Sequence, residues 1–397
     1  MPLSKKIAFA AACLAVVGFA GFRVTGWATG GLGGECRRRF TPDGRAECYE
    51  RLFTDRLAAY GVANAVATLD TIARNDRTVS RRAHEYAHGI GIEAYGRYPD
   101  IVSTFTACGD AAASGCRHGF IQAYFESRER VTTPEIEAFC RPFKGSAPGG
   151  PGASRWILFQ CVHGMGHGLA MFYDHDLPHA LAMCDQLRDG WDRESCYGGA
   201  FMESDMNAIA PHHPATELAA RSHHAGHPAF KAIDRADPLY PCSIMEDRYL
   251  RACFEIQTAV ILHLNHGDIG AAALTCDSAV KHMRHVCYTS LGRDITSYAV
   301  RDARKSADLC AKGSPEYRPS CYVGVAKALV DWTADTDNAL AFCGIVAPNG
   351  AAGRDACYSA VGEQIATLSS NAARRAAECE RALNREAIAA CRRGAQL

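Results

Sequence analysis

The stretch ALTCDSAVKHMRHVCYTSLGRDI, residues 273–295, contains the unit that organises this chain of 397 residues. A helix-forming segment ends at a first cysteine, a polar connection follows, and a second helix-forming segment begins at a second cysteine. The unit recurs at intervals of 34, 34, 36 and 34 residues, measured between the second cysteines Cys253, Cys287, Cys321, Cys357 and Cys391. A repeat of this length is typical of two-helix units that stack into a solenoid. We therefore predict an all-α fold, an α/α solenoid of two-helix repeats.

Cysteine pairing predicts the compartment in which the chain folds. Eighteen of the 19 cysteines form couples of near neighbours, and such even pairing indicates disulfides made outside the cytosol. Each bridge would join the end of one helix to the start of the next and stabilise the fold by roughly 3 kcal/mol. The couples are Cys36/Cys48, Cys108/Cys116, Cys140/Cys161, Cys184/Cys196, Cys242/Cys253, Cys276/Cys287, Cys310/Cys321, Cys343/Cys357 and Cys379/Cys391.

Small residues recur just after the second cysteine of the repeat. Glycine at these points would let the backbones of neighbouring helices approach closely. The glycines are Gly198, Gly199, Gly292, Gly324 and Gly362.

The repeat length resembles that of tetratricopeptide and Sel1-like helical repeats. It is also similar to the cysteine-bridged α/α repeats of exported microbial proteins. The resemblance covers residues 105–395, and the tryptophan and Leu-Gly signature of tetratricopeptide repeats is absent from it. It implies a fold and no activity.

The first 23 residues have the composition of a targeting segment. Lys5 and Lys6 precede an apolar run over residues 7–22, which is short for a bilayer span of ~20 residues. We expect either a signal peptide cleaved after Ala20 or an uncleaved anchor in the inner membrane. Both alternatives predict an extracytoplasmic protein, either periplasmic or secreted.

Composition and motifs exclude several classes of function. Lys plus Arg equals Asp plus Glu at 43 each, so the neutral chain has no overall attraction to nucleic acid. The chain contains no G-x-S-x-G, P-loop, dinucleotide or C-x-x-C motif. We divide it into a leader at 1–23, a helical region at 24–105, histidine-bearing repeats at 106–203, a His- and Pro-rich insertion at 204–241, and structural repeats at 242–397. The surface of these last repeats could bind a protein partner in the envelope.

Histidines stand at equivalent positions of the early repeats. His88, His118 and His163 each follow the cysteine position of their repeat by two residues. Equivalent positions in stacked repeats share a direction and lie ~10 Å apart. His84 and His167 each add an imidazole one helical turn from a member of this row. The five imidazoles predict one transition-metal site, or two close ones, for Zn, Cu or Fe. His175 and His179 would be outer residues of this site. A packed or pH-sensing cluster is the alternative.

The segment HEYAH, residues 84–88, matches H-E-x-x-H. It resembles the zincin motif, in which the glutamate activates a metal-bound water, so Glu85 is the predicted catalytic base. The segment is also similar to the His-Glu pairs of HEAT-repeat hydroxylases, which implies further carboxylates, with Glu93 and Glu203 nearest. The sequence therefore favours a metal-dependent hydrolase, and less strongly an oxygenase. The alternative is a non-enzymatic scaffold or metal carrier.

Overall fold

The computed structural model describes residues 33–109, 114–144, 155–209, 230–333 and 335–397. In this part of the chain the regular elements are helices and no β-strand occurs, which confirms the predicted all-α class. No described helix is long and apolar enough to cross a membrane. The predicted leader at 1–23 and most of the predicted insertion at 204–241 lie outside the described residues.

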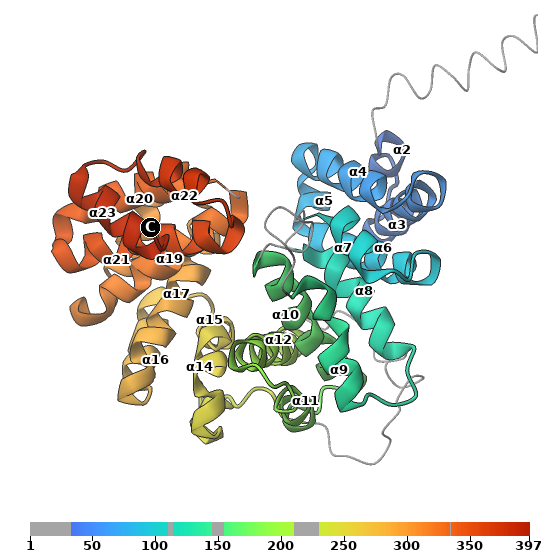
Figure 1. Ribbon diagram of the computed structural model, residues 1–397, viewed down its shortest axis with the longest axis horizontal. Coiled ribbons are helices and arrows are strands. Elements are labelled where there is room, and N and C mark those ends of the chain that lie inside the picture. The colour runs from blue at the N-terminus through green and yellow to red at the C-terminus, as the bar shows by residue number, and fades with distance from the viewer. Residues whose placement is uncertain (1–32, 110–113, 145–154, 210–229, 334) are drawn as a thin grey trace, which may run out of the picture. The chain divides into compact units, whose positions relative to one another are not determined.

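Contacts divide the chain into two compact units. The described part of unit 1 comprises residues 33–99, 107–109 and 114–119, and that of unit 2 comprises residues 100–106, 120–144, 155–209, 230–333 and 335–397. Helices α7 (Ile101–Cys108) and α8 (Gly115–Glu126) contribute to both units. The other helices of unit 1, labelled in Figure 1, are α2 (Gly34–Arg37), α3 (Pro42–Tyr60), α4 (Val62–Asn75), α5 (Arg77–Arg81) and α6 (Ala83–Arg97).

The core of unit 1 uses an aromatic residue where later repeats use a disulfide. Tyr86 on α6 stands at the second-cysteine position of its repeat and is buried. Its ring packs against Tyr49 and Phe53 of α3, with ring centroids 6.1 and 5.4 Å away. Aromatic pairs at these distances are favourable beyond the area they bury. Packing therefore holds α6 to α3 without a covalent bridge.

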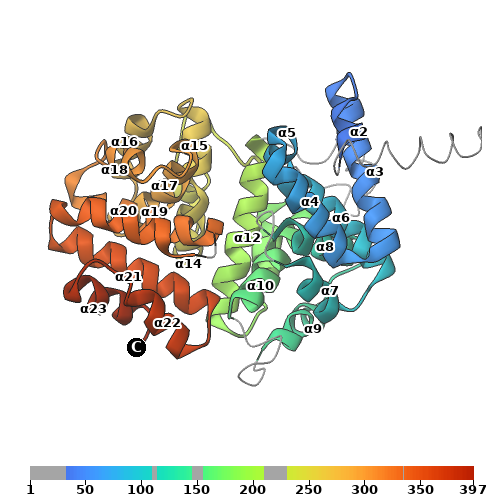
Figure 2. The ribbon, with the colours of Figure 1, turned by 90° about the horizontal axis from the view of Figure 1, so that it is seen from above.

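Unit 2 consists of short first helices that alternate with longer second helices. Neighbouring second helices lie side by side, as α19 and α21 do in Figure 2. The helices are α9 (Thr133–Phe139), α10 (Arg155–Phe172), α11 (Leu177–Cys184), α12 (Gly190–Ile209), α14 (Asp247–Ile256), α15 (Thr258–Leu264), α16 (Ile269–Ser278), α17 (Arg284–Tyr298), α18 (Ala303–Cys310), α19 (Arg318–Thr333), α20 (Asp337–Val346), α21 (Ala351–Leu368), α22 (Ala372–Cys379) and α23 (Arg385–Gly394).

All nine predicted disulfides are present, with the predicted pairing. Their number supports folding in an oxidising, extracytoplasmic compartment. The bridges are Cys36–Cys48, Cys108–Cys116, Cys140–Cys161, Cys184–Cys196, Cys242–Cys253, Cys276–Cys287, Cys310–Cys321, Cys343–Cys357 and Cys379–Cys391.

The prediction that the second cysteine of each couple begins a helix is wrong in detail. Cys48 lies well inside α3, whose start is capped by the Thr41 hydroxyl group, which accepts a hydrogen bond from a backbone N–H of the first turn. Cys196 lies well inside α12, where the Asp189 carboxylate accepts from the first backbone N–H groups. Capping residues decide where a helix starts, and here they precede the cysteine.

One of the two bridges of unit 1 also differs from the predicted repeat. Cys116 is the second residue of α8, so it does stand at a helix start, but it follows Cys108 by only 8 positions. The predicted connection was about a dozen residues, as in the bridge of Cys36 to Cys48, whose separation is 12. The division after residue 105 placed these two bridges in different regions of the chain. The structure buries both of them in the same hydrophobic core, that of unit 1.

Glycines bring second helices into direct backbone contact, as predicted. A Cβ atom at Gly199 of α12 would lie 1.8 Å from the carbonyl oxygen of His163 on α10. A Cβ atom at Gly166 of α10 would lie 2.0 Å from the carbonyl oxygen of Cys196 on α12. Only glycine permits this approach. The same reciprocal arrangement involves Gly292 and Gly324 between α17 and α19, and Gly362 and Gly394 between α21 and α23.

One turn recurs between a second helix and the next first helix. Two consecutive residues have positive φ, and the aspartate that follows caps the next helix. The φ values are 53° and 61° at Asp174 and His175, 53° and 80° at His266 and Gly267, and 55° and 63° at Val300 and Arg301.

Candidate functional site

The predicted row of histidines belongs to two units. His84, His88 and His118 lie in unit 1, and His163 and His167 lie in unit 2. The prediction that all five share one site therefore stays a prediction. In the part of the chain that the structure describes, no group of three or more His, Cys, Asp or Glu side chains is arranged to hold a metal ion.

Three imidazoles gather in unit 1. The ring of His84 lies 6.2 Å from that of His88 and 5.6 Å from that of His118, measured between centroids. A Cβ atom at Gly119 of α8 would lie 1.9 Å from the carbonyl oxygen of His88, so α6 and α8 approach closely here. His118 is buried and His84 is exposed. His84 therefore lies close to both of the other two histidines.

The carboxylates predicted to assist in unit 1 are exposed and paired with arginines. Glu85 accepts a hydrogen bond of 2.8 Å from Nε of Arg82, and its side chain is 50% exposed. Glu93 lies 3.9 Å from Arg97, with a side chain that is 51% exposed. A general base must reach the proton that it abstracts. Glu85 would have to leave Arg82 to act on a water bound between His84 and His88.

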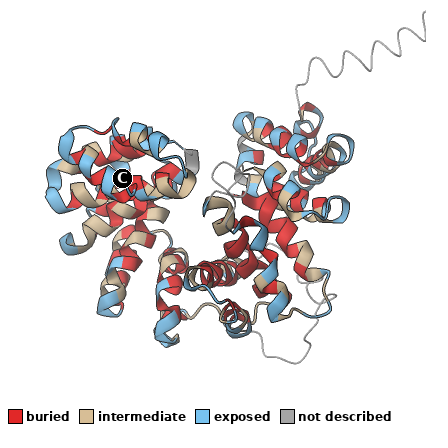
Figure 3. Ribbon diagram, in the orientation of Figure 1, coloured by how far each residue is buried: buried red, intermediate tan, exposed pale blue. Residues whose placement is uncertain are grey.

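The interior of unit 2 holds a tighter pair. His163 and His167 lie one turn apart on α10, and their Nε2 atoms are 3.3 Å apart. Each residue is only 7% exposed. Figure 3 shows α10 and α12 buried along most of their described length. This pair is the most enclosed of the predicted histidine pairs.

Glu203 of α12 connects this pair to a further histidine. Its Oε2 atom lies 3.0 Å from Nδ1 of His167, and its Oε1 atom lies 3.1 Å from Nε2 of His175. Burial by itself raises the pKa of Glu203, but the hydrogen bonds from both histidines outweigh it and hold the pKa well below its usual range. Glu203 is therefore an ionised carboxylate that accepts from two imidazoles.

These hydrogen bonds decide which ring nitrogens carry hydrogen. The ionised Glu203 requires an N–H at Nδ1 of His167. The ring of His163 donates to the backbone of Ser195, and Nδ1 is its available donor because Nε2 faces His167. Each Nε2 of a neutral ring then carries a lone pair, and the two lone pairs face each other. Burial, with the nearby His167 and Arg293, lowers the pKa of His163 to about 3, so that ring stays neutral. The arrangement requires either a proton on His167 or a cation between the rings.

A second buried carboxyl group on α12 was missed by the sequence reasoning. Asp205 is 1% exposed, and within the described residues its Oδ1 has no hydrogen-bond partner. Burial raises its pKa to about 8, and the charge of Arg293 opposes the increase. Asp205 is therefore mainly neutral at pH 7. The sequence shows Asp205 two residues after Glu203, but its burial depends on neighbouring helices and is not visible in the sequence.

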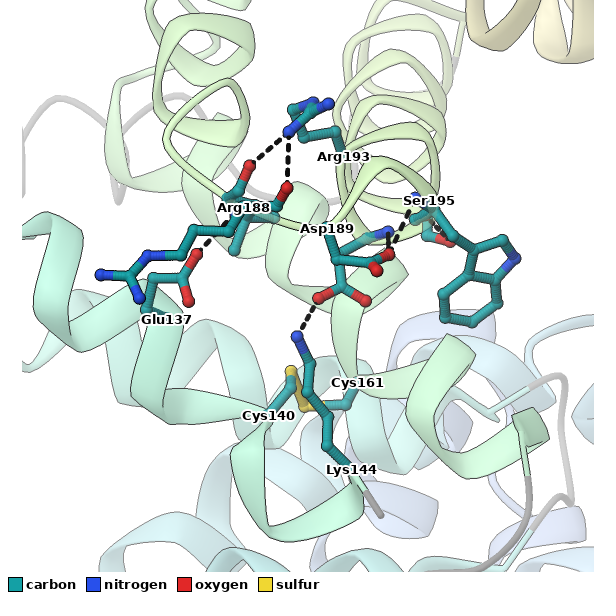
Figure 4. Close-up of polar contacts among 11 residues, drawn as sticks. Glu137, Cys140, Lys144, Cys161, Arg188, Asp189, Arg193 and Ser195 are labelled. Atoms are coloured by element: carbon teal, nitrogen blue, oxygen red, sulfur yellow. Dashed lines mark hydrogen bonds and ion pairs between the residues drawn. A yellow bond between two sulfur atoms is a disulfide. The ribbon is translucent and has the colours of Figure 1, made fainter.

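A group of polar contacts secures the start of α12. Lys144 pairs with the buried Asp192 near the Cys140–Cys161 bridge, and the Glu137 carboxylate accepts from the backbone N–H of Arg188 at 2.7 Å (Figure 4). These contacts join α9 and the following 3-10 turn to α12. They anchor the start of the helix that carries Glu203 to the segment that ends α9.

Comparisons with protein-family models, with curated proteins and with solved structures find no match for this chain. The function is therefore inferred from the side chains of the two units.

Proposed function

We propose that this is an exported helical-repeat protein that binds one transition-metal ion between His163 and His167. In this proposal residues 1–23 are the signal peptide or anchor, and the repeats form a solenoid in the periplasm or outside the cell. The observation that carries the proposal is the pair of buried Nε2 atoms 3.3 Å apart, with Nδ1 of His167 held by Glu203 and the ring of His163 hydrogen-bonded to the backbone of Ser195.

The separation of the two nitrogens fits zinc-like coordination. With metal–nitrogen bonds of about 2.05 Å, nitrogens at the tetrahedral angle lie about 3.3 Å apart. The same bonds at a right angle give about 2.9 Å, and a linear arrangement gives about 4.1 Å. The hydrogen bond from His167 to Glu203 adds a carboxylate–histidine contact of the kind that orients metal ligands.

Carriage of the ion is better supported than hydrolysis at this pair. Two protein ligands leave two tetrahedral positions open, which suits an ion that is received and passed on. Glu203, the nearby carboxylate, is engaged by two imidazoles and so is a poor general base. The surface of residues 242–397 would then serve a protein partner in the envelope.

A hydrolase in unit 1 is the second candidate, because the ring of His84 lies close to those of His88 and His118 and Glu85 follows His84 in the chain. Release of Glu85 from Arg82 would be its required step. Glu85→Gln should abolish metal-dependent hydrolysis while the metal is retained. Equal activity in this variant would contradict the hydrolase proposal.

The proposal is tested by metal analysis of the full chain exported to an oxidising compartment. We expect one ion that survives dialysis in the wild type and is lost in His163→Gln and in His167→Gln. His282→Gln, at an exposed histidine of the same unit, is the matched control and should keep the ion. Retention of the ion in both core variants, with wild-type circular dichroism, would contradict the proposal.

A further inference from the structure

One carboxylate in unit 2 is held from two sides. Glu203 is 5% exposed, so neither of its oxygens has ready access to water. Oε2 accepts from His167 and Oε1 accepts from His175, at 3.0 and 3.1 Å. A buried acceptor that loses its donor bears the full cost of desolvation. The position of the carboxylate against His167 therefore depends on His175 as well.

We infer that His175 is a positioning residue for the metal-binding pair. It anchors Oε1 of Glu203, and the carboxylate in turn holds Nδ1 of His167 so that Nε2 faces His163. This inference rests on the proposed function of that pair. When His175 is removed, the carboxylate can turn away to find another donor, and the ring of His167 loses its fixed orientation.

The backbone at His175 does not itself need an imidazole. The residue has a φ of 61° in the turn after α10, and its N–H donates to the carbonyl oxygen of Ala170 at 2.8 Å. In the equivalent turn after α15, Gly267 has a φ of 80° and donates to Leu262 in the same way. Glycine adopts such angles more easily than any other residue. The side chain at 175 is thus accounted for by Glu203 and not by the turn.

The equivalent turn supplies the best test substitution. His175→Gly keeps the backbone conformation and removes the imidazole, whereas His175→Gln keeps a donor that can reach Glu203. Asp174→Gly relaxes the same turn, where φ is 53°, and keeps the imidazole. Each full-length variant is titrated with Zn²⁺ against a chromophoric chelator, and its Co²⁺ complex is examined by visible absorption.

We expect His175→Gly to weaken Zn²⁺ binding about tenfold and to change the Co²⁺ spectrum, as loss of an outer hydrogen bond to a ligand does. His175→Gln should retain most of the affinity, and Asp174→Gly should match the wild type. Thermal unfolding of the metal-free variants verifies that each is folded.

The outcomes separate the two claims. If His167→Gln abolishes binding while His175→Gly leaves the affinity and the spectrum unchanged, the inference is wrong and the proposed function stands. If Asp174→Gly weakens binding as much as His175→Gly, the effect belongs to the turn and the inference is again wrong. If the wild type binds no Zn²⁺, the inference fails together with the proposed function.

Discussion

The α10–α12 pair and the α19–α21 pair of unit 2 use one repeat position for different purposes. His167 and Lys327 both stand six residues after the second cysteine of their repeat. His167 is buried against Glu203, whereas Lys327 forms an ion pair of 2.8 Å with Glu363, and both of those side chains are partly exposed. Exposed ion pairs contribute little to stability. The comparison teaches that a polar side chain at this point of the repeat can serve either as a buried hydrogen-bonding group or as an exposed ion pair, and that burial decides which.

The largest effects should come from glycines that bring second helices together. Gly199→Ala would force a Cβ atom against the carbonyl oxygen of His163, and Gly324→Ala would do the same against Thr289. We expect each to lower the free energy of unfolding by about 3 kcal/mol. Chemical denaturation measures this loss. Gly198→Ala is the control, because its Cβ atom would lie 3.5 Å from the ring of His163.

The same two substitutions should differ in their effect on metal binding, because only the α10–α12 pair carries the proposed site. Gly199→Ala should also remove metal binding, because it separates α10 from α12, whereas Gly324→Ala should leave it intact. Loss of the metal in both variants would show that the two pairs are not independent and would break the comparison.

The second effect is on the pH dependence of stability, through Asp205. Its folded pKa of about 8 lies above the ordinary value of 3.8, so the folded chain binds an extra proton between these values. Stability from this group is present at low pH and is lost as the pH rises toward 8, by at most about 1.4 kcal/mol per pH unit. Asp205→Asn should remove that slope and stabilise the protein at pH 7, as urea unfolding from pH 4 to pH 8 would show.

Asp331 of α19 is the matched control for this measurement. Burial raises its pKa only to about 6, while the hydrogen bond from Gln364 and the charge of Lys327 oppose the increase. Asp331→Asn should therefore change the pH dependence of the free energy of unfolding over a narrower pH range, which ends near pH 6. A wider pH range of effect for Asp331→Asn than for Asp205→Asn would contradict the deeper burial of Asp205.

The smallest effect is expected at the ion pair of α19 and α21. Lys327→Met should change the free energy of unfolding by less than about 1 kcal/mol, because both partners are partly exposed. The change should shrink further in high salt. A loss of several kcal/mol, measured by urea unfolding, would show that this pair is as closely coupled as the histidine pair.

Much of the fold could be predicted because the signals are local in sequence. The spacing of the cysteines identified every disulfide couple, and the glycines after Cys196 and Cys321 identified close helix contacts. The adjacency of His163 and His167 also followed from helical spacing. The cysteine pattern did not predict where most helices start. Capping residues such as Asp189 set those starts, and they precede the cysteines.

The rest of the site depends on contacts that no local pattern encodes. His175 approaches Glu203 only because a left-handed turn follows α10, and no glycine marks that turn. The burial of Asp205 depends on helices packed against α12. Glu93 and Glu203 occupy equivalent repeat positions, yet one is exposed beside Arg97 and the other is enclosed. Sequence position predicted where these carboxylates would stand, but not how far neighbouring helices would cover them.

The most direct measurement is X-ray absorption at the zinc edge of the full-length protein loaded with one equivalent of Zn²⁺. Two imidazole nitrogens and oxygen ligands at about 2.0–2.1 Å are expected, and the imidazole signal should disappear in His163→Gln and His167→Gln. A sulfur shell, or a spectrum that both substitutions leave unchanged, would contradict a metal ion held by the buried histidine pair.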